Sequence, residues 1–414
     1  MGADPDRFKR RRRIAIAAAL LLGIGAASAF LVLRKPGNVS NPTATFTATQ
    51  TKPPAPRVVD WPIYGFDMAR TKWYRTSKKL EPPYRRIWSY RGAKLLEFPP
   101  VLDRGGLYLL DDGAALRSLT LSGGHHRWRK QLGSLAASSP ALDGNGSVYA
   151  VTLLDSPSSG HGSAWAVKAA TGKTLWRRVL PSRAESSPLI LGHLMIFGTE
   201  DGTVFALNTK NGKTVWKYSA AGSVKGAVAF SRGRLYFGDY GGQVHSISAR
   251  DGHRYWTASP GGRFYSTGAL AWGRFYVGNT DGRMYSYTTS GELAWARQTG
   301  AYVYASPAVA DAGAGPTVYA GSYDGTFYAW NAKTGDTRWT YNAGGRISGG
   351  AFVIGDLVWF DDLGHERTVA LSAKTGRRRF TMETGAFNPV ITDGRTMYIV
   401  GYSNLYGFVP KGHR

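Results

Sequence analysis

A tryptophan recurs at one position of a repeated motif in this sequence. An indole ring can serve as a stacking platform for a planar cofactor, so this residue could take part in cofactor binding. The motif reads ALNTKNGKTVW at 206–216, and related copies stand at 166–176 (AVKAATGKTLW) and 329–339 (AWNAKTGDTRW). A ring that recurs in every copy cannot mark a single cofactor site. Its regular place after a turn favours a structural aromatic that buries a large area and satisfies its indole N–H locally.

Few other residues have the types and spacing of a catalytic or metal site. The DGNG run at 143–146 is rich in oxygen donors, but it lacks the distal glutamate of an EF-hand and falls where a hairpin turn is due. His125 and His126 are adjacent, so on a strand they point to opposite faces and suit a metal poorly. The absence of cysteine excludes disulfides, thiolate metal sites and a cysteine nucleophile. With no recognisable nucleophile, base and orienting group, we predict no catalytic residue, no cofactor and no metal.

The elements that carry these residues repeat about every 40 positions. Each unit holds strand-like runs such as TVFALN, separated by Asp-Gly or Asn-Gly turns that require positive φ angles. Nearly continuous apolar character suits strands that are covered on both faces. The aromatic position recurs at intervals of 40, 48, 40, 40, 39, 44 and 41 residues, at Trp88, Trp128, Trp176, Trp216, Trp256, Trp295, Trp339 and Phe380. A period of about 40 with strand-like content predicts propeller blades, with these aromatics as structural residues.

The count of units predicts how the ring closes. Eight segments begin a unit, and the last, from Asn388, ends without its own tryptophan strand. The missing strand is expected near 85–90, where Trp88 precedes the first complete unit. Both ends of the chain would then share one blade and remove the open edge of the ring. The sequence therefore predicts an all-β, eight-bladed β-propeller over residues 61–414.

The first 60 residues predict attachment to a membrane. A basic segment at 1–13 precedes an uncharged, mostly apolar run at 14–33, which as a helix is long enough for a hydrocarbon core of about 30 Å. The positive-inside rule leaves 1–13 in the cytoplasm. We expect a single-pass signal-anchor, an N-terminal transmembrane helix, in the cell membrane, a Thr/Pro-rich tether at 34–60, and the propeller on the extracytoplasmic side. A cleavable signal peptide is the alternative, because Ala-Ser-Ala at 27–29 has the pattern of a processing site.

The formal net charge of +25 favours association with anionic surfaces. We find no dense run of lysine and arginine outside the N-terminus, so the charge is read as spread over a solvated surface. We therefore predict a monomeric propeller with no nucleic-acid partner.

The motif ALNTKNGKTVW, with six related copies, resembles the pyrroloquinoline-quinone-type propeller repeat, and DWPIYGFDMART at 60–71 resembles the lead-in segment often found before such propellers. The resemblance covers roughly residues 60–410. It implies a family that contains quinoprotein dehydrogenases and also non-enzymatic propellers of the BamB type, which are assembly or scaffold proteins. The dehydrogenases hold the quinone between an aromatic ring and a disulfide of adjacent cysteines, beside calcium ligands and a catalytic aspartate. Because this chain has no cysteine and its units hardly depart from 40 residues, the BamB-like branch is favoured and the quinone-dependent dehydrogenase is the alternative.

Strand direction predicts a binding surface on one rim. If the four strands of each blade alternate in direction, the connections between blades emerge on the same rim as those between second and third strands. That rim collects tyrosine and arginine, which are typical of binding hot spots, although turns need polar residues regardless. The candidate partner-binding residues are Arg263, Tyr265, Tyr302, Tyr304, Arg346, Asp239 and Tyr323, and the long insertion at 153–162 falls on the same rim. We expect a protein-binding scaffold or envelope-assembly factor whose partner is an envelope protein or an anionic wall polymer.

Overall fold

The computed structural model describes residues 37–48, 60–76 and 80–412. Contacts divide the chain into two units, Met1–Asn38 and Val39–Arg414, and all described strands belong to the second. In these described ranges there is no α-helix, and thus none long and apolar enough to cross a membrane. The predicted basic segment at 1–13 and the predicted transmembrane helix at 14–33 lie outside the described residues.

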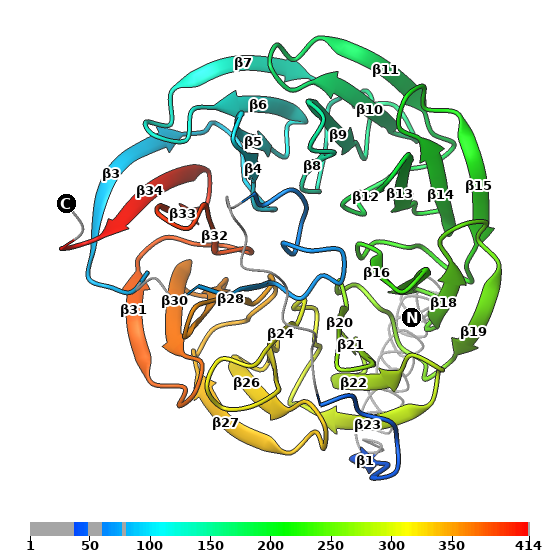
Figure 1. Cartoon of the computed structure of the whole chain (residues 1–414), viewed down its shortest axis with the longest axis vertical. Helices are drawn as coiled ribbons and strands as arrows, with labels where there is room; N and C mark the ends of the chain where they lie inside the picture. Colours follow the sequence, from blue (N-terminus) through cyan, green and yellow to red (C-terminus); the bar gives the residue numbers. More distant parts are fainter. Residues whose placement is uncertain (1–36, 49–59, 77–79, 413–414) are drawn as a thin grey trace, which may run out of the picture. The chain divides into compact units, whose positions relative to one another are not determined.

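Eight antiparallel blades surround a central channel in the second unit, so the predicted all-β, eight-bladed propeller is confirmed (Figure 1). Blade 1 comprises β4 (Val101–Asp103), β5 (Gly106–Leu110), β6 (Ala115–Leu119) and β7 (His126–Gln131), and blade 2 comprises β8 (Ala141–Leu142), β9 (Ser147–Val151), β10 (Ser163–Lys168) and β11 (Thr174–Val179). Blade 3 comprises β12 (Leu189–Leu191), β13 (Leu194–Gly198), β14 (Thr203–Asn208) and β15 (Thr214–Ser219), and blade 4 comprises β16 (Ala229–Ser231), β17 (Arg234–Gly238), β18 (Val244–Ser248) and β19 (Arg254–Ala258). Blade 5 comprises β20 (Ala269–Ala271), β21 (Arg274–Gly278), β22 (Arg283–Thr288) and β23 (Leu293–Gln298), and blade 6 comprises β24 (Ala308–Ala310), β25 (Thr317–Gly321), β26 (Thr326–Asn331) and β27 (Thr337–Asn342). Blade 7 comprises β28 (Phe352–Ile354), β29 (Leu357–Asp362), β30 (Arg367–Ser372) and β31 (Arg378–Met382), and blade 8 comprises β32 (Val390–Thr392), β33 (Met397–Val400), β34 (Asn404–Pro410) and β3 (Tyr84–Arg91).

Blade 8 joins the two ends of the propeller. Its outer strand β3 pairs antiparallel with β34, and Trp88 stands opposite Gly407 (Figure 1). Because β3 precedes blade 1 in the chain, its pairing with β34 closes the ring through main-chain hydrogen bonds between the two ends of the propeller.

The recurring tryptophans join each blade to the next. Their rings lie against the positive-φ glycine of the neighbouring turn; a Cβ on Gly212 would come 2.7 Å from the Trp176 ring. Each indole Nε1 donates to a main-chain carbonyl of the next blade: Trp88 to Leu121 (3.1 Å), Trp128 to Ala169 (2.8 Å), Trp176 to Thr209 (2.7 Å), Trp216 to Ala249 (3.2 Å), Trp256 to Thr289 (3.0 Å), Trp295 to Ala332 (2.9 Å) and Trp339 to Ala373 (3.1 Å). Each of these indole N–H groups is therefore hydrogen-bonded within the propeller.

Phe380 occupies the eighth position without such a bond. Its ring packs against Tyr84 at 5.2 Å and Trp359 at 5.6 Å between centroids. The next blade there is blade 8, whose strands β34 and β3 come from opposite ends of the chain and are joined by no turn. A phenylalanine suffices because no turn carbonyl is presented for an indole to bind.

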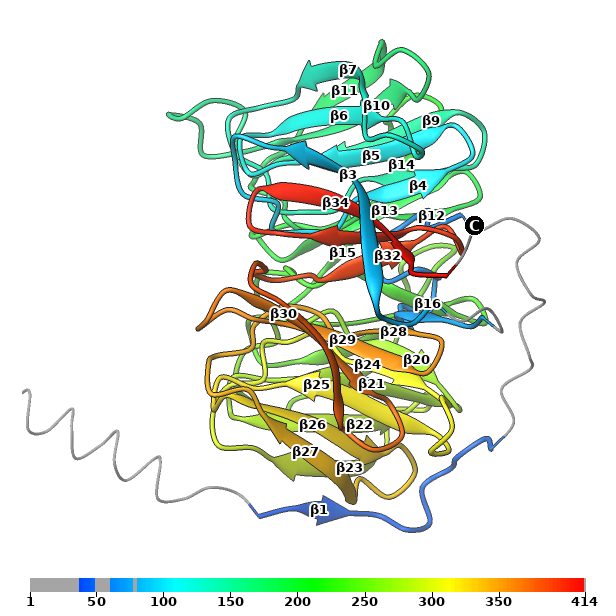
Figure 2. The same ribbon diagram turned by 90° about the vertical axis from the view of Figure 1, so that its left-hand side faces the viewer.

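Residues 39–47, which fall within the predicted tether at 34–60, lie against blade 5. The short strand β1 (Val39–Ser40) pairs with β23 at the outside of the blade, as both views show (Figures 1 and 2). The Arg274 guanidinium donates to the carbonyls of Ala44 (2.8 Å) and Thr45 (2.9 Å). Composition predicts an extended tether at 34–60, and the outer edge of β23 and Arg274 supply hydrogen bonds to part of it that composition alone does not indicate.

The lead-in segment 60–76 lies in the middle of the ring and follows the inner strands in blade order (Figure 1). Main-chain hydrogen bonds join Trp61 to Leu102 in blade 1, Pro62 to Leu142 in blade 2, Met68 to Phe230 in blade 4, Ala69 to Leu270 in blade 5, Thr71 to Val309 in blade 6 and Lys72 to Val353 in blade 7. The segment ends in β2 (Trp73–Tyr74), which pairs parallel with β28. This stretch therefore forms a floor across the central channel.

Candidate functional site

A cavity of about 260 Å³ lies above this floor, at the mouth of the channel. Two positions of the repeat form most of its wall: the fourth and the second residue before the innermost strand of a blade. The lining residues are Tyr64, Glu97, Phe98, Glu185, Ser187, Lys225, Gly226, Ala227, Tyr240, Tyr265, Thr267, Tyr304, Ser306, Tyr323, Ser348, Gly349, Gly350, Phe387 and Asn388. The connections between blades thus converge on one pocket, as expected for a propeller.

Two buried cations hold the floor of the pocket in place. Arg70 donates through Nε to the Val228 carbonyl (3.0 Å) and through Nη2 to Ser187 and Pro188. Burial lowers the pKa of Arg70 to about 10. Since its donors meet main-chain carbonyls of blades 3 and 4, the charge is used by the fold and is not presented to a ligand.

Lys72 binds main-chain carbonyls of blades 5 and 6 in the same way. Its Nζ donates to the carbonyls of Arg70 (3.1 Å), Thr267 (3.3 Å) and Pro307 (3.1 Å). Burial, and then the nearby Arg70, lower its pKa well below the usual value. The ammonium also lies 5.5 Å from the centre of the Tyr64 ring, which lines the pocket above it.

Tyrosines from blades 4, 5 and 6 form a continuous aromatic wall. Tyr265 contacts Tyr240 (6.3 Å between centroids) and Tyr304 (5.3 Å), and Tyr304 contacts Tyr302 (5.7 Å) and Tyr323 (5.0 Å). Most of these contacts are tilted or edge-to-face, the geometry that aromatic quadrupoles prefer. Four of these tyrosines, Tyr240, Tyr265, Tyr304 and Tyr323, line the cavity.

Charged residues from blades 1, 3 and 4 form a second wall, which adjoins the aromatic wall where Lys225 Nζ lies 5.3 Å from the centre of the Tyr240 ring. Lys225 Nζ lies 2.6 Å from Glu185 Oε1 and 2.7 Å from Glu200 Oε1. Burial alone would lower the pKa of Lys225, but these two carboxylates raise it. Glu97 is the remaining charged group of this wall, and burial, with repulsion from Asp112 and Glu185, raises its pKa to about 7.

The structure places six of the seven candidate rim residues around this pocket. Tyr265, Tyr304 and Tyr323 line it, and Tyr302 stands beside them with 50% of its side chain exposed. Arg263 lies over the Tyr240 ring at 5.7 Å and Arg346 over the Tyr323 ring at 6.0 Å. Whether these residues bind a partner stays a prediction.

Asp239 is the exception and corrects the predicted set. Its carboxylate is buried and accepts hydrogen bonds from the Gln243 amide (2.9 Å), the Ala221 amide (2.9 Å) and, at 2.9 Å, the His245 ring. These three hydrogen bonds engage both carboxylate oxygens of the buried Asp239 within the fold, so its side chain belongs to the framework of the rim.

Glu97, Tyr64 and Phe98 were missed by the sequence-based prediction. The register of the repeat holds the missing signal, because the fourth residue before the inner strand reads, in blade order, Glu97, Ala137, Glu185, Lys225, Tyr265, Tyr304, Ser348 and Ala386. Aligning this single position around the ring separates a charged side from an aromatic side.

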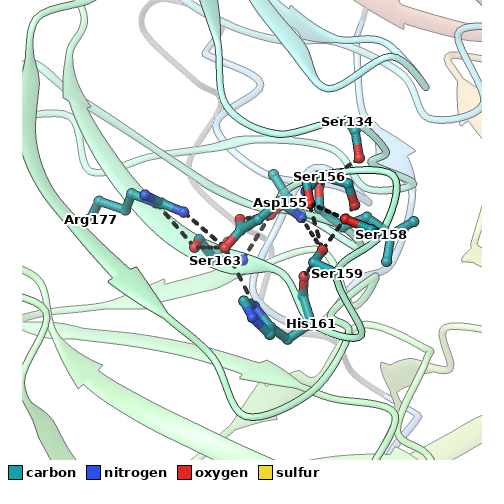
Figure 3. A network of polar contacts seen from close by, with 10 residues as sticks. Ser134, Asp155, Ser156, Ser158, Ser159, His161, Ser163 and Arg177 are labelled. Carbon is teal, nitrogen blue, oxygen red and sulfur yellow. Dashed lines mark hydrogen bonds and ion pairs between the residues drawn. The ribbon is translucent and has the colours of Figure 1, made fainter.

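The insertion at 153–162 forms a polar network with Ser134, Ser163 and Arg177 (Figure 3). None of these residues lines the pocket. The Asp155 carboxylate accepts hydrogen bonds from Ser163 Oγ (2.8 Å) and Arg177 Nη2 (2.8 Å), and His161 Nδ1 lies 3.5 Å from it. Ser159 Oγ donates to the His161 carbonyl. In the described part of the chain no serine hydroxyl of this loop bonds to the His161 ring, so the loop lacks a paired nucleophile and base.

The DGNG run is the hairpin between β8 and β9. Asp143 Oδ1 accepts the amides of Asn145 (2.8 Å) and Ser147 (3.1 Å). Over the described ranges, no group of three or more His, Cys, Asp or Glu side chains is arranged to hold a metal ion.

Comparison with known proteins identifies the family. The model described as "Outer membrane protein assembly factor BamB" matches residues 70–223 and 215–408, which together span most of the propeller. The chain belongs to this family. No curated protein matches it.

Solved structures similar to this BamB-family chain include a BamB protein and two dehydrogenases. BamB from Moraxella catarrhalis is 19% identical, with 80% of this chain and 99% of that chain covered and a TM-score of 0.64. The quinohemoprotein alcohol dehydrogenase ADHIIG from Pseudomonas putida HK5 is 14% identical, with 86% and 81% covered and a TM-score of 0.71. A europium-containing methanol dehydrogenase is 13% identical, with 84% and 98% covered and a TM-score of 0.71. At these identities the likeness shows the fold alone.

The residues of the pocket do not fit the quinone of such dehydrogenases. Pyrroloquinoline quinone carries carboxylate groups, so it needs cationic partners. Here Glu97 and Glu185 line the cavity, and the Lys225 ammonium is already shared by two carboxylates. The chain also lacks the cysteines of the disulfide that the resemblance implies.

Proposed function

We propose that this protein is a membrane-tethered, extracytoplasmic binding propeller that holds a partner protein of the cell envelope at its central pocket, without a catalytic step or a bound cofactor. The observation that carries the proposal is the pocket, a preformed cavity of about 260 Å³ with an aromatic wall above a fixed floor. Tyrosine and arginine beside such a cavity are typical of binding hot spots.

The rigid framework supports a binding role. Buried cations fix the floor, indole hydrogen bonds join successive blades, and β3 closes the ring. A preformed site avoids the entropic cost of ordering loops when a partner binds. An anionic wall polymer fits this pocket less well than a protein does, because carboxylates line it.

The proposed location rests on the sequence of residues 1–33. A basic segment followed by 20 uncharged residues favours an anchor with its N-terminus in the cytoplasm. Alkaline phosphatase fused after Asp60 is expected to be active, since that enzyme needs an oxidising compartment. Activity only from a cytoplasmic reporter at the same position would contradict the proposed topology.

Affinity capture from the native membrane tests the binding role. The full chain is crosslinked in its own membranes and compared with a variant carrying Tyr265→Ala, Tyr302→Ala and Tyr304→Ala. Tyr255→Ala is the control, because Tyr255 is 48% exposed but lies on the outer strand β19, away from the pocket. We expect the wild type and the control to retain the same envelope partners and the triple variant to lose them.

Two results would contradict the proposal. Equal capture by the triple variant, with an unchanged melting temperature, would remove the pocket from partner binding. Stoichiometric binding of pyrroloquinoline quinone with calcium, together with dye-linked oxidation of an alcohol or a sugar, would establish the dehydrogenase instead.

A further inference from the structure

The pocket has a charged wall with one carboxylate more than it can pair. Lys225 is the one cationic side chain among the lining residues, and Glu185 and Glu200 both contact it. Glu97 stands on the same wall, and no hydrogen bond or ion pair within the described ranges reaches its carboxylate. The main chain there is fixed, because the Asn388 side chain donates to the Glu97 carbonyl at 2.6 Å.

The electrostatic environment of Glu97 favours a cation. Burial and the neighbouring carboxylates of Asp112 and Glu185 raise its pKa to about 7, with Lys225 acting in the opposite direction. Asp112, which follows β5, has a pKa raised to about 6 by burial and by Asp111. This local excess of negative charge contrasts with the net charge of +25 on the whole chain.

The aromatic wall of the same cavity supplies tyrosine rings, which can bind the same cation. Lys225 Nζ already lies 5.3 Å from the centre of the Tyr240 ring, and Arg346 lies over Tyr323. The rings of Tyr265 and Tyr304 carry no such cation in the described structure, and their hydroxyl groups make no hydrogen bond there. Tyrosine faces attract ammonium groups within about 6 Å of the ring centre.

We propose that the central pocket binds a primary ammonium group, with the Glu97 carboxylate as its ion-pair partner and Tyr265 and Tyr304 as its cation–π partners. A compact ammonium has three donors, and the Glu97 carboxylate is an acceptor that the fold leaves open. The ammonium group belongs either to a lysine side chain of the partner protein or to a free alkylamine. The inference rests on the proposed function for the view that this pocket is a binding site.

Calorimetric titration of the full chain in detergent tests this chemistry. The probes are n-butylamine, a short peptide with one central lysine, and two neutral counterparts, n-butanol and the same peptide with the lysine acetylated. We expect both ammonium probes to bind and the neutral probes not to bind. Glu97→Gln is expected to weaken ammonium binding about tenfold, since a charge-assisted contact is lost.

The pH dependence gives a second readout. The groups that face Glu97 are Asp112, Glu185, Lys225 and Tyr265, of which Asp112 also titrates near neutrality. Ammonium affinity is expected to rise from pH 5.5 to pH 8 as Glu97 ionises, and Glu97→Gln is expected to flatten that rise. Glu366→Gln, at an exposed position outside the pocket, makes the same charge change and is expected to leave both readouts unchanged.

The outcomes separate this inference from the proposed function. Binding of n-butylamine without the lysine peptide supports the ammonium site and identifies a free amine as its source. Equal binding of neutral and ammonium probes, no binding of any probe, or unchanged binding by Glu97→Gln would overturn the inference. Loss of partners from the triple tyrosine variant together with no ammonium binding would leave the proposed function standing and remove the ammonium site alone.

Discussion

The floor and the mouth of the central channel treat charge in opposite ways. In the floor, the donors of Arg70 and Lys72 meet main-chain carbonyls from four blades. At the mouth, the Glu97 carboxylate and the hydroxyls of Tyr265 and Tyr304 have no hydrogen-bond partner in the part of the chain that the structure describes. The cations of the floor are paired within the fold and hold the site in position. The polar groups at the mouth have no partner within the fold and are therefore available to a ligand.

Removal of a floor cation is expected to lower the free energy of unfolding more than the other substitutions. Arg70→Ala leaves buried carbonyls without donors and opens a cavity, so it should lower the free energy of unfolding by about 3–5 kcal/mol. Arg263→Ala removes a cation from the mouth and should change it by about 0.5 kcal/mol. Denaturant unfolding measures the free energy of unfolding of both variants. Similar values for the two would contradict the expected difference between the floor and the mouth.

The tryptophans between blades are expected to contribute to stability about as strongly as the floor cations. Trp216→Ala is expected to cost about 3–5 kcal/mol as a large-to-small change between blades. Trp216→Phe should cost only about 1 kcal/mol, because it keeps most of the packing and loses the hydrogen bond to Ala249. Phe380 shows that this position accepts a ring without a donor. A negligible thermal shift for Trp216→Ala would return this tryptophan to the candidates for ligand binding.

At the mouth, the ionised Glu97 carboxylate is instead expected to lower the stability of the folded protein. Because the pKa of Glu97 is raised to about 7 in the folded protein, the folded state binds more protons than the unfolded state between the ordinary value of about 4.5 and pH 7. The contribution of Glu97 to stability is therefore present below pH 4.5 and lost as the pH rises through 7.

Glu97→Gln tests that sign. The variant should be more stable than the wild type by about 2 kcal/mol at pH 8 and nearly equal to it at pH 4. Thermal unfolding at both pH values measures the difference. A destabilised variant at pH 8 would mean that Glu97 is part of the framework after all.

The smallest effect on stability is expected at the exposed tyrosine. Tyr302→Ala should change the free energy of unfolding by about 0.5 kcal/mol, because half of the side chain is already in solvent. The same variant should weaken capture of the envelope partner, since Tyr302 extends the aromatic wall beyond Tyr304 and Tyr323. Full capture by the variant would confine the site to the lining of the cavity.

The fold was predictable because its repeat is local. The spacing of the tryptophans and the positive-φ turns fixes one blade at a time, and the count of eight units requires a closing strand, which the structure supplies as β3. Tyr265 and Tyr304 could also be placed on one rim, because strand alternation decides the direction of each connection.

The remaining features depend on contacts between distant residues. Nothing near Arg70 in the sequence shows that its acceptors are Ser187, Pro188 and Val228. The burial of Asp239 depends on its bond to His245, and the docking of residues 39–47 depends on Arg274 and the edge of β23. Glu97 occupies the same repeat position as Glu185, Lys225 and Tyr265, but its place in the pocket emerges only when that position is aligned around the whole ring.

Carbon-detected NMR titration of the Glu97 carboxyl tests the central claim most directly, because it reports whether the mouth holds an unpaired charge that a ligand cation relieves. Glu97 in the free protein is expected to titrate with a pKa of about 7, and saturating n-butylamine is expected to lower this pKa. A pKa near the ordinary value of about 4.5 in the free protein, unchanged by the amine, would contradict the central claim.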